Sequence, residues 1–466
     1  MSQVALSSIN SSIIDEISSS KNEPNWLKDY RKNSLEVYNK LPQEVSPLYN
    51  KYSDAKRMDP EQVALSSTSD TTLPDFLNKR LDEIKKENSI FQIGSNIHYV
   101  NILDEEKSSG LIISSIDDAL KENSDLIQKT LESTNSNEDK YTALNNAAFN
   151  SGIFVYVPEN AVIEKPIHLV SSLSSDDIST ISRNIVIVEK NSRARIVQEL
   201  YSPKTSKQQA YLELLNTSVA GNSNLDLTTL QMMDQSSVNF STRRANIAQD
   251  SKVNAYLGLF GTMLSRYRID YHLNDTGSSV NDAEVVFGNS DQSFDLNTTV
   301  NHNAQSTEGK VVEKSILKDT SKSLFKGMIR INEEASHSSS FLSGRSILLD
   351  KGAKSDAIPG LEILTNDVKA THSASVAQID EEQIFYLGSR CLSRSEAERI
   401  IVEGFLEPLS RSMSHQVRAW IAYLIESKWQ NEELSINNDE QLKAIVEVEE
   451  TRYNENAEIE QHYKYR

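Results

Sequence analysis

The central part of the chain alternates hydrophobic and polar residues with a period close to two. From about Phe154 to Gln378 short runs of this kind follow one another, and helical periodicity is nearly absent. Side chains of a strand point alternately to the two faces of a sheet, so the pattern predicts a succession of short strands. The clearest runs are NIVIVEKNSRARIVQEL, NLDLTTLQMM, YRIDYHLN, AEVVFG, GMIRIN and RSILLD.

The strand-rich region is repetitive. A small or polar corner followed by an alternating run begins near Asn222, Ser236, Asp250, Ser278, Glu308, Glu334 and Lys351, and several intervals lie near 14 or 28 residues. Such a repeat fits two to three short strands per coil of a parallel β-helix, in which each coil buries its apolar face against the next. No proline lies between Pro203 and Pro359, as expected of strands with neighbours on both sides.

An antiparallel sandwich is the alternative fold, because the repeat is degenerate. Two-residue hairpin turns such as NG and DG are missing from the region, and this favours the solenoid. We therefore predict a mostly β protein in which a parallel β-helix is flanked by N-terminal and C-terminal α-helical domains.

Helical patterns flank the predicted β-helix core, residues 154–378. Residues 1–95 contain separate helical pieces, and residues 96–153 are predicted to be a mixed α/β segment that leads into the sheet. In the second N-terminal piece, aromatic and aliphatic residues recur near a helical turn, as an amphipathic helix requires: Trp26, Tyr30, Leu35 and Tyr38.

Helical periodicity returns after Gln378 and predicts a C-terminal helical domain at residues 379–430. Ser393 followed by Glu396 forms a capping box for its second helix. Residues 431–466 are acidic and polar, and we expect them to be a largely mobile tail.

Composition limits the kind of partner. Hydrophobic residues make up 38% and charged residues 25% of the 466, a globular balance. A net charge of −19 argues against nucleic acid or an anionic membrane as the main partner. The N-terminus lacks a cationic segment followed by an apolar one, and no run of about 18 apolar residues occurs, so we expect a cytoplasmic protein.

The segment Pro359–Arg390, PGLEILTNDVKATHSASVAQIDEEQIFYLGSR, and the SEAERIIVEGF after it carry the strongest similarity to known sequences. They resemble the SufB/SufD family of iron–sulfur cluster assembly scaffolds. Further segments are similar to that family in the same order: EPNWLKDYR, ALNNAAFNSGIFVYVPENAVIEKPIHL, VNHNAQST and FKGMIRINEEASHSSSFLSGRSILL. The chain is interpreted as a SufD-like member.

The resemblance implies a scaffold subunit of the SUF complex that is not itself an enzyme. It implies pairing with a SufB-type sister subunit, or with a second copy, through the β-helix, and docking of the ABC ATPase SufC on the C-terminal helices. Candidate docking residues are Glu396, Ile400, Ile401 and Phe405. The chain contains no GxxxxGK[ST] phosphate loop, so nucleotide hydrolysis is assigned to the partner.

The same resemblance implies a transient iron–sulfur cluster shared with the partner subunit. SufB-type chains have a cysteine where this chain has Ile363, which favours SufD, and His372 matches a histidine proposed to act in cluster formation. Neutral imidazole can ligate iron in place of thiolate, so His372 is the candidate metal ligand. A reduced flavin is compatible with the resemblance, but no segment of the sequence indicates one.

Two positions depart from the family pattern. Many SufD chains carry a cysteine where this chain has Ala370, and family members usually have glycine where it has Cys391. Cys391 is the single cysteine, which excludes an intrachain disulfide and leaves this chain a minority of the ligands of a cluster. We expect Cys391 to be a small buried residue rather than a reactive thiol.

Less specific interpretations stay open. His372 could instead satisfy backbone groups at a coil end, and His302 and His337 are expected at the surface or at coil corners. The helices from Glu381 to Trp429 could cover the last open coil, as solenoids require, besides docking a partner. A different class of protein, a β-helix that binds or cleaves polysaccharide, is the alternative function.

Overall fold

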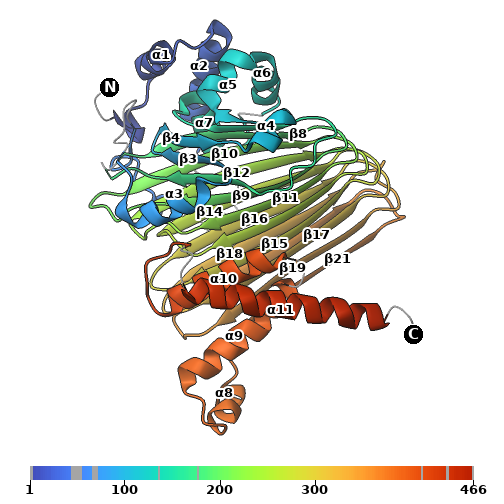
Figure 1. The fold of residues 1–466 in the computed structure, drawn as a ribbon. Coiled ribbons are helices and arrows are strands. Elements are labelled where there is room, and N and C mark those ends of the chain that lie inside the picture. Colours follow the sequence, from blue (N-terminus) through green and yellow to red (C-terminus); the bar gives the residue numbers. More distant parts are fainter. Residues whose placement is uncertain are drawn as a thin grey trace.

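The computed structural model describes residues 4–42, 55–65, 72–134, 137–175, 178–410, 413–436 and 440–463. Within them the chain forms a parallel β-helix with helices on both sides (Figure 1). The predicted fold class is therefore confirmed.

Two sheets make up the β-helix, and each coil contributes one strand to each. One sheet contains, in spatial order, β5 (Ile112–Ser115), β6 (Ile153–Val157), β8 (Thr180–Val188), β10 (Gln209–Val219), β12 (Ser237–Ile247), β14 (Leu264–Leu273), β16 (Ser293–His302), β18 (Lys322–Ile331) and β20 (Lys354–Ile363). The other contains β4 (Asn96–Asn101), β3 (Asn88–Ile93), β7 (Ile167–Ser172), β9 (Arg193–Tyr201), β11 (Asn224–Gln231), β13 (Lys252–Leu259), β15 (Ser279–Gly288), β17 (Glu308–Leu317), β19 (Ser339–Leu348) and β21 (Lys369–Gln378). We call the sheet with β6 to β20 the even sheet and the sheet with β3 to β21 the odd sheet. The even sheet also includes β5, and the odd sheet also includes β4.

The corners between the strands explain the repeat in the sequence. Asn222 and Asp250 adopt positive φ values of 59° and 53°, which short polar residues tolerate better than most others. At one corner the Asn222 side chain donates a hydrogen bond to Asn191 of the preceding coil, 31 residues earlier. At another corner Asn274 bonds in the same way to Asn246, 28 residues earlier. Polar side chains stacked one coil apart thus hold the register.

The N-terminal helices cover the outer face of the even sheet. They are α1 (Ser11–Ser20), α2 (Asn25–Lys40), α5 (Ile116–Glu122), α6 (Ser124–Glu132) and α7 (Lys140–Ala148), with the short α4 (Asp104–Ser108) nearby in sequence. Leu27, Leu144 and Phe149 share one buried cluster with Ile185 and Phe240 of the sheet. The region predicted to be helical, residues 1–95, also includes β3, which pairs with β7 inside the odd sheet.

The outer face of the odd sheet is covered by α3 (Asn78–Ile84), α10 (His415–Trp429) and the first part of α11 (Glu440–Tyr463). Trp420 and Leu424 of α10 pack in one cluster with Val197 of that sheet and with Phe260, which follows β13. The interpretation of the C-terminal helices as a cover for the last coil is therefore wrong, because α10 packs along the side of the stack and the last strand, β21, stays exposed.

Part of the segment predicted to be a tail belongs to α11, which packs on α10. Leu442 is buried, Ile445 and Val446 pack in the same cluster, and Glu449 pairs with Arg418 at 3.3 Å. An acidic composition did not prevent a helix because its few apolar residues recur on one face.

Two further C-terminal helices, α8 (Glu381–Gly388) and α9 (Arg394–Ser410), project from the end of the molecule opposite to the N-terminal helices (Figure 1). The predicted capping box is confirmed: Glu396 accepts hydrogen bonds from the Ser393 backbone N–H and hydroxyl, both at 2.7 Å. Cys391, between the two helices, is exposed and has a φ of 68°. Our expectation of a buried Cys391 was wrong, because the turn between α8 and α9 lies outside the core.

No helix in the described ranges is both long enough and apolar enough to cross a lipid bilayer.

Candidate functional site at the open end of the β-helix

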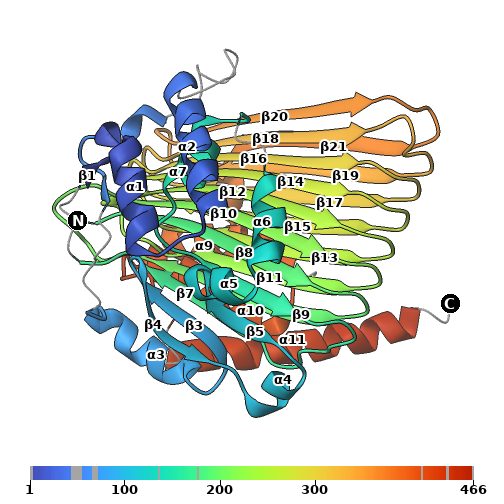
Figure 2. The ribbon, with the colours of Figure 1, turned by 90° about the horizontal axis from the view of Figure 1, so that it is seen from above.

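The last coil of the β-helix is uncovered. Strands β20 and β21 form the outer edges of the two sheets, and no strand within the described ranges pairs with their free sides (Figure 2). Almost every residue of β21 is exposed, whereas the strands in the middle of the stack are largely buried. The open end therefore presents unpaired backbone groups together with apolar side chains: Leu361, Ile363 and Val376.

His372 lies at this open end, on the inner side of β21. Its register partner on β19 is Leu342, which belongs to the core between the two sheets, and the nearby Ala370 packs against the same core. Because alternate residues of a strand share a face, His372 points toward the interior of the β-helix. The imidazole is nonetheless exposed, since no further coil of the described residues lies above it. The structure thus places this imidazole at an uncovered coil end rather than inside a closed coil.

The layer beneath His372 is closed by two large side chains that pack over glycines. A Cβ added to Gly327 would lie 2.5 Å from the side chain of Leu342, and one added to Gly344 would lie 2.5 Å from the ring of Phe325. Both glycines are therefore needed for the close approach of the sheets. Leu342 and Phe325 form an apolar floor that separates the open end from the rest of the interior.

The other histidines named from the sequence lie elsewhere. His337 occupies an exposed coil corner, as expected, where its Nδ1 lies 2.8 Å from Asp367. His302 does not lie at the surface: it is buried, its Nδ1 is 2.7 Å from the Thr307 hydroxyl, and burial lowers its pKa to about 4. Among the described residues, no three His, Cys, Asp or Glu side chains gather closely enough to hold a metal ion. If His372 ligates a metal, the other ligands must come from elsewhere.

The four docking candidates on α9 have different environments. Ile400 is 43% exposed, and Glu396 is exposed but is already used as the helix cap. Ile401 and Phe405 are partly buried against the odd sheet, where the Lys314 amine donates to the Phe405 carbonyl. The most exposed apolar residues of this region are instead on α8, where Phe385 is 79% and Tyr386 is 56% exposed.

Sequence reasoning missed a set of polar side chains inside the β-helix. Glu213 is fully buried and accepts hydrogen bonds from Asn184 (2.8 Å), Gln198, Ser241 (2.5 Å) and Arg243 (2.9 Å). Burial alone would raise the pKa of Glu213, but Arg243 and these bonds outweigh it and lower that pKa.

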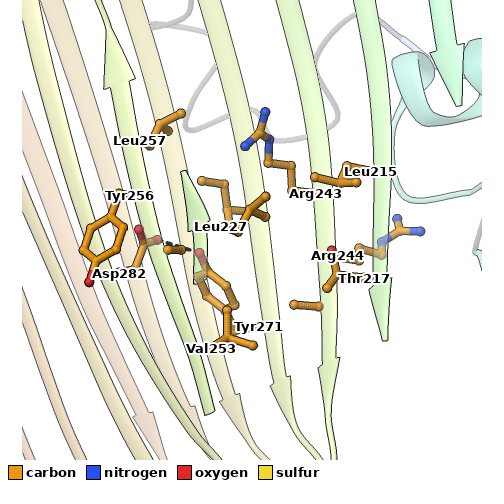
Figure 3. A pocket seen from close by; sticks show the side chains of 13 residues that line it. Leu215, Thr217, Leu227, Arg243, Arg244, Val253, Tyr256, Leu257, Tyr271 and Asp282 are labelled. Carbon is orange, nitrogen blue, oxygen red and sulfur yellow. Dashed lines mark hydrogen bonds between the residues drawn. The ribbon is translucent and has the colours of Figure 1, made fainter. Parts of the chain in front are cut away.

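Further along the interior, three buried carboxyl groups form no salt bridge with a basic side chain of the described residues: Asp282, Glu284 and Glu313. Tyr271 of the even sheet donates to Asp282 of the odd sheet at 2.9 Å, next to a cavity of about 30 Å³ that has room for water (Figure 3). Burial raises the pKa of Asp282 to about 6 and that of Glu313 to about 8. Glu284, the register partner of Glu313, has its pKa raised by burial and by the charge of Asp282.

A sequence signal for these residues exists in retrospect. Asp282 and Glu284 fall in the same alternation phase as Val280 and Val286, so they occupy positions that the pattern assigns to the core. The result is an interior in which buried polar side chains lie among the apolar ones beneath the floor of the open end.

Comparisons with known proteins give the family. Residues 171–405 match the model described as "SUF system FeS cluster assembly, SufBD core domain", and residues 83–169 match the "SufBD protein N-terminal region". The chain belongs to the SufBD family. The core match ends inside α9, so it includes the strands of the open end and all of α8.

Curated relatives of this SufBD protein cover most of its length. An iron–sulfur cluster assembly SufBD family protein of Staphylococcus aureus strain USA300 is 27% identical over 417 residues, 86% of this chain and 89% of the relative. A family member from Staphylococcus saprophyticus is 26% identical over the same shares. The family places this chain in iron–sulfur cluster assembly, and the alternative of a protein that acts on polysaccharide finds no support in these matches.

Proposed function

We propose that this chain is a non-enzymatic, cytoplasmic scaffold subunit of the SUF complex. In this proposal it pairs through its open end with a SufB-type sister chain or with a second copy, and the pair shares a transient iron–sulfur cluster. A SufC-type ABC ATPase docks on the α8–α9 projection, and neither nucleic acid nor membrane is a main partner. The observation that carries the proposal is the uncovered last coil in a protein of this family.

Edge strands with exposed apolar side chains favour a partner of the same kind. A free strand edge is a template for pairing with another chain, and natural solenoids normally cover their terminal repeats. Here β20 and β21 are each ten residues long and bear no covering element among the described residues. A second β-helix end would satisfy both edges at once, which a single helix or loop could not do.

The position of His372 favours a cluster site within that interface. It projects from an edge strand toward the space that a paired coil would enclose, above the apolar floor of Leu342 and Phe325. One imidazole is a minority of the ligands that a cluster needs, so the partner would supply the others. A site split between two chains opens whenever they move apart, which suits a cluster that must later be released.

Replacing His372 by alanine tests this site. In the assembled complex we expect His372→Ala to lower cluster yield at least about tenfold and to leave SufC binding unchanged. Loss of a residue that only supports a metal ligand already lowers metal affinity or activity by about tenfold or more, so loss of a ligand should cost at least as much. Visible absorption with iron and sulfide analysis measures the yield. His337→Ala, at an exposed corner one coil below the open end, is the matched control and should give the wild-type yield. Equal yields in the two variants would remove His372 from the site.

We propose that SufC docks on a surface centred on Phe385 and Tyr386 of α8. Ile400, on the following helix α9, is the third exposed apolar residue of this surface. Large exposed aromatics are typical anchors of protein interfaces, and truncating an anchor costs about 2 kcal/mol or more. We expect Phe385→Ser with Tyr386→Ser to weaken SufC binding about 30-fold or more, measured by calorimetry. Val448→Ser on α11, a residue 50% exposed, is the control that should leave affinity unchanged. Wild-type affinity in the double variant would exclude α8 as the docking surface.

A further inference from the structure

A second cavity lies away from the open end, between the C-terminal end of α10 and the corners of four coils. Its volume is about 540 Å³. Phe76, Met232, Met233, Phe260 and Leu434 give it apolar walls, and polar side chains such as Asp234, Gln235, Glu432 and Glu433 surround them. The descriptions of the matching family models name no cavity, and the proposed scaffold function does not involve this one.

Lys428 of α10 lines the cavity and is 5% exposed. Its amine donates to the Phe260 backbone carbonyl and, at 2.6 Å, to the side-chain oxygen of Gln292. The orientation of Gln292 is fixed because its amide nitrogen donates to the Thr262 carbonyl at 2.6 Å. Gln292 therefore presents an acceptor, and Lys428 must be the donor in their bond.

No carboxylate within the described ranges forms an ion pair with Lys428. The rings of Phe287 and Phe294 lie 5.8 and 5.9 Å from its nitrogen. Burial lowers the pKa of Lys428 well below its usual value. A neutral amine has two N–H groups, and the two acceptors use both, so none of the described residues donates to the nitrogen lone pair. An ammonium group would instead bury an unpaired third N–H and an uncompensated charge.

We propose that this cavity is a binding site for a small neutral carbonyl compound, an aldehyde or ketone with an apolar body, which condenses with the Lys428 amine. The carbonyl class follows from the free lone pair, since buried neutral lysines are nucleophiles toward carbonyl carbon. A neutral ligand follows from the rim, where Asp234, Glu432 and Glu433 outnumber Lys204 and would repel an anion. The apolar body follows from the two methionines and the phenylalanines of the walls.

The reaction is an imine condensation. The Lys428 lone pair forms a bond to the carbonyl carbon while the C=O π bond breaks, and the oxygen receives a proton to give a carbinolamine. Loss of that hydroxyl group, together with the second amine proton, releases one water molecule and leaves a C=N bond. No electrons are gained or lost overall, so no oxidant or reductant takes part.

Trapping of the imine on the full-length protein tests the proposal. The protein is incubated with benzaldehyde and sodium cyanoborohydride near pH 7.4, and the benzylated lysines are quantified by peptide mass spectrometry. A lysine of ordinary pKa is neutral in only about one molecule in 1,000 at this pH. We therefore expect Lys428 to be modified at least about tenfold faster than the exposed Lys204 of the same rim. Modification at the rate of Lys204 or below would overturn the proposal and make Lys428 a structural contact.

A pocket-blocking variant separates entry through the cavity from local unfolding. Gln235 is an exposed rim residue, so Gln235→Trp should narrow the cavity without touching Lys428. We expect it to slow the modification of Lys428 severalfold, whereas Gln249→Trp, at an exposed corner that does not line the cavity, leaves the rate unchanged. If both variants react as fast as the wild type, the aldehyde does not enter through this cavity and the proposed site is wrong.

Discussion

A variant with a lysine on each edge strand, Leu361→Lys on β20 and Val376→Lys on β21, is expected to lose pairing almost completely. The two side chains are 37% and 43% exposed, so the isolated chain should fold normally. In a paired coil they would be buried, and each would carry an ammonium group without a counter-charge. We expect the dissociation constant to rise at least about 100-fold, which corresponds to about 3 kcal/mol.

Sedimentation velocity measures this effect in two settings, the chain alone and the chain mixed with a SufB-type sister. A homodimer would be lost in the first setting and a heterodimer in the second. The matched control is Val100→Lys with Val162→Lys, at residues that are 40% and 52% exposed; Val100 lies on β4, the edge strand at the other end of the odd sheet. If the Val100→Lys, Val162→Lys variant loses pairing and the Leu361→Lys, Val376→Lys variant keeps it, the interface lies at the β4 end instead.

The β-helix could be predicted because its determinants are local. Alternation along each strand and polar corners such as Asn222 and Asp250 are visible in the sequence, and both residues adopt the positive φ that such corners need. The capping box of Ser393 and Glu396 is local as well, since three residues and one turn of helix define it.

The placement of the C-terminal helices could not be predicted in the same way. The spacing of Trp420, Ile421 and Leu424 shows that α10 has a buried face, but not which surface of the β-helix receives it. The cap over the last coil was inferred from what solenoids usually need, whereas here the end stays open. The prediction that Cys391 is buried was wrong for a related reason. The average burial of cysteine does not apply to a turn that projects from the core.

His372 was found only through resemblance, and the structure adds its direction and exposure. Nothing in the alternation of β21 distinguishes an inward residue of a covered coil from one of an open coil. Lys428 was missed because it lies on a helix with mixed polarity, and its partners, Phe260 and Gln292, come from coils more than a hundred residues earlier.

The stability of the chain is expected to depend on pH through Glu313. This carboxyl group is fully buried, its second oxygen has no hydrogen-bond partner among the described residues, and burial raises its pKa to about 8 from an ordinary 4.5. The folded state therefore keeps a proton that the unfolded state loses between about pH 4.5 and pH 8. Within that window stability falls as pH rises, by about 1.4 kcal/mol per unit for this group. The contribution is complete below pH 4.5 and is lost as pH rises through 8.

Glutamine in place of Glu313 isolates this effect, because it has nearly the same shape and can still accept the hydrogen bond from Ser315. We expect Glu313→Gln to unfold at a higher urea concentration than the wild type at pH 8. The difference in free energy of unfolding between variant and wild type should be about 3 kcal/mol more favourable to the variant at pH 8 than at pH 5. The difference between variants is needed because other groups act in the opposite direction. Burial would raise the pKa of Glu199, but Arg80 and His168 outweigh it and lower that pKa.

Glu308→Gln is the matched control for the pH experiment. Glu308 begins the same strand, β17, but is exposed, so the difference between this variant and the wild type should not change with pH. If the stability difference between Glu313→Gln and the wild type also stays constant with pH, water reaches the Glu313 carboxylate in the folded state. The polar part of the interior would then be hydrated rather than dry, and the carboxyl groups of Asp282, Glu284 and Glu313 would be charged at neutral pH.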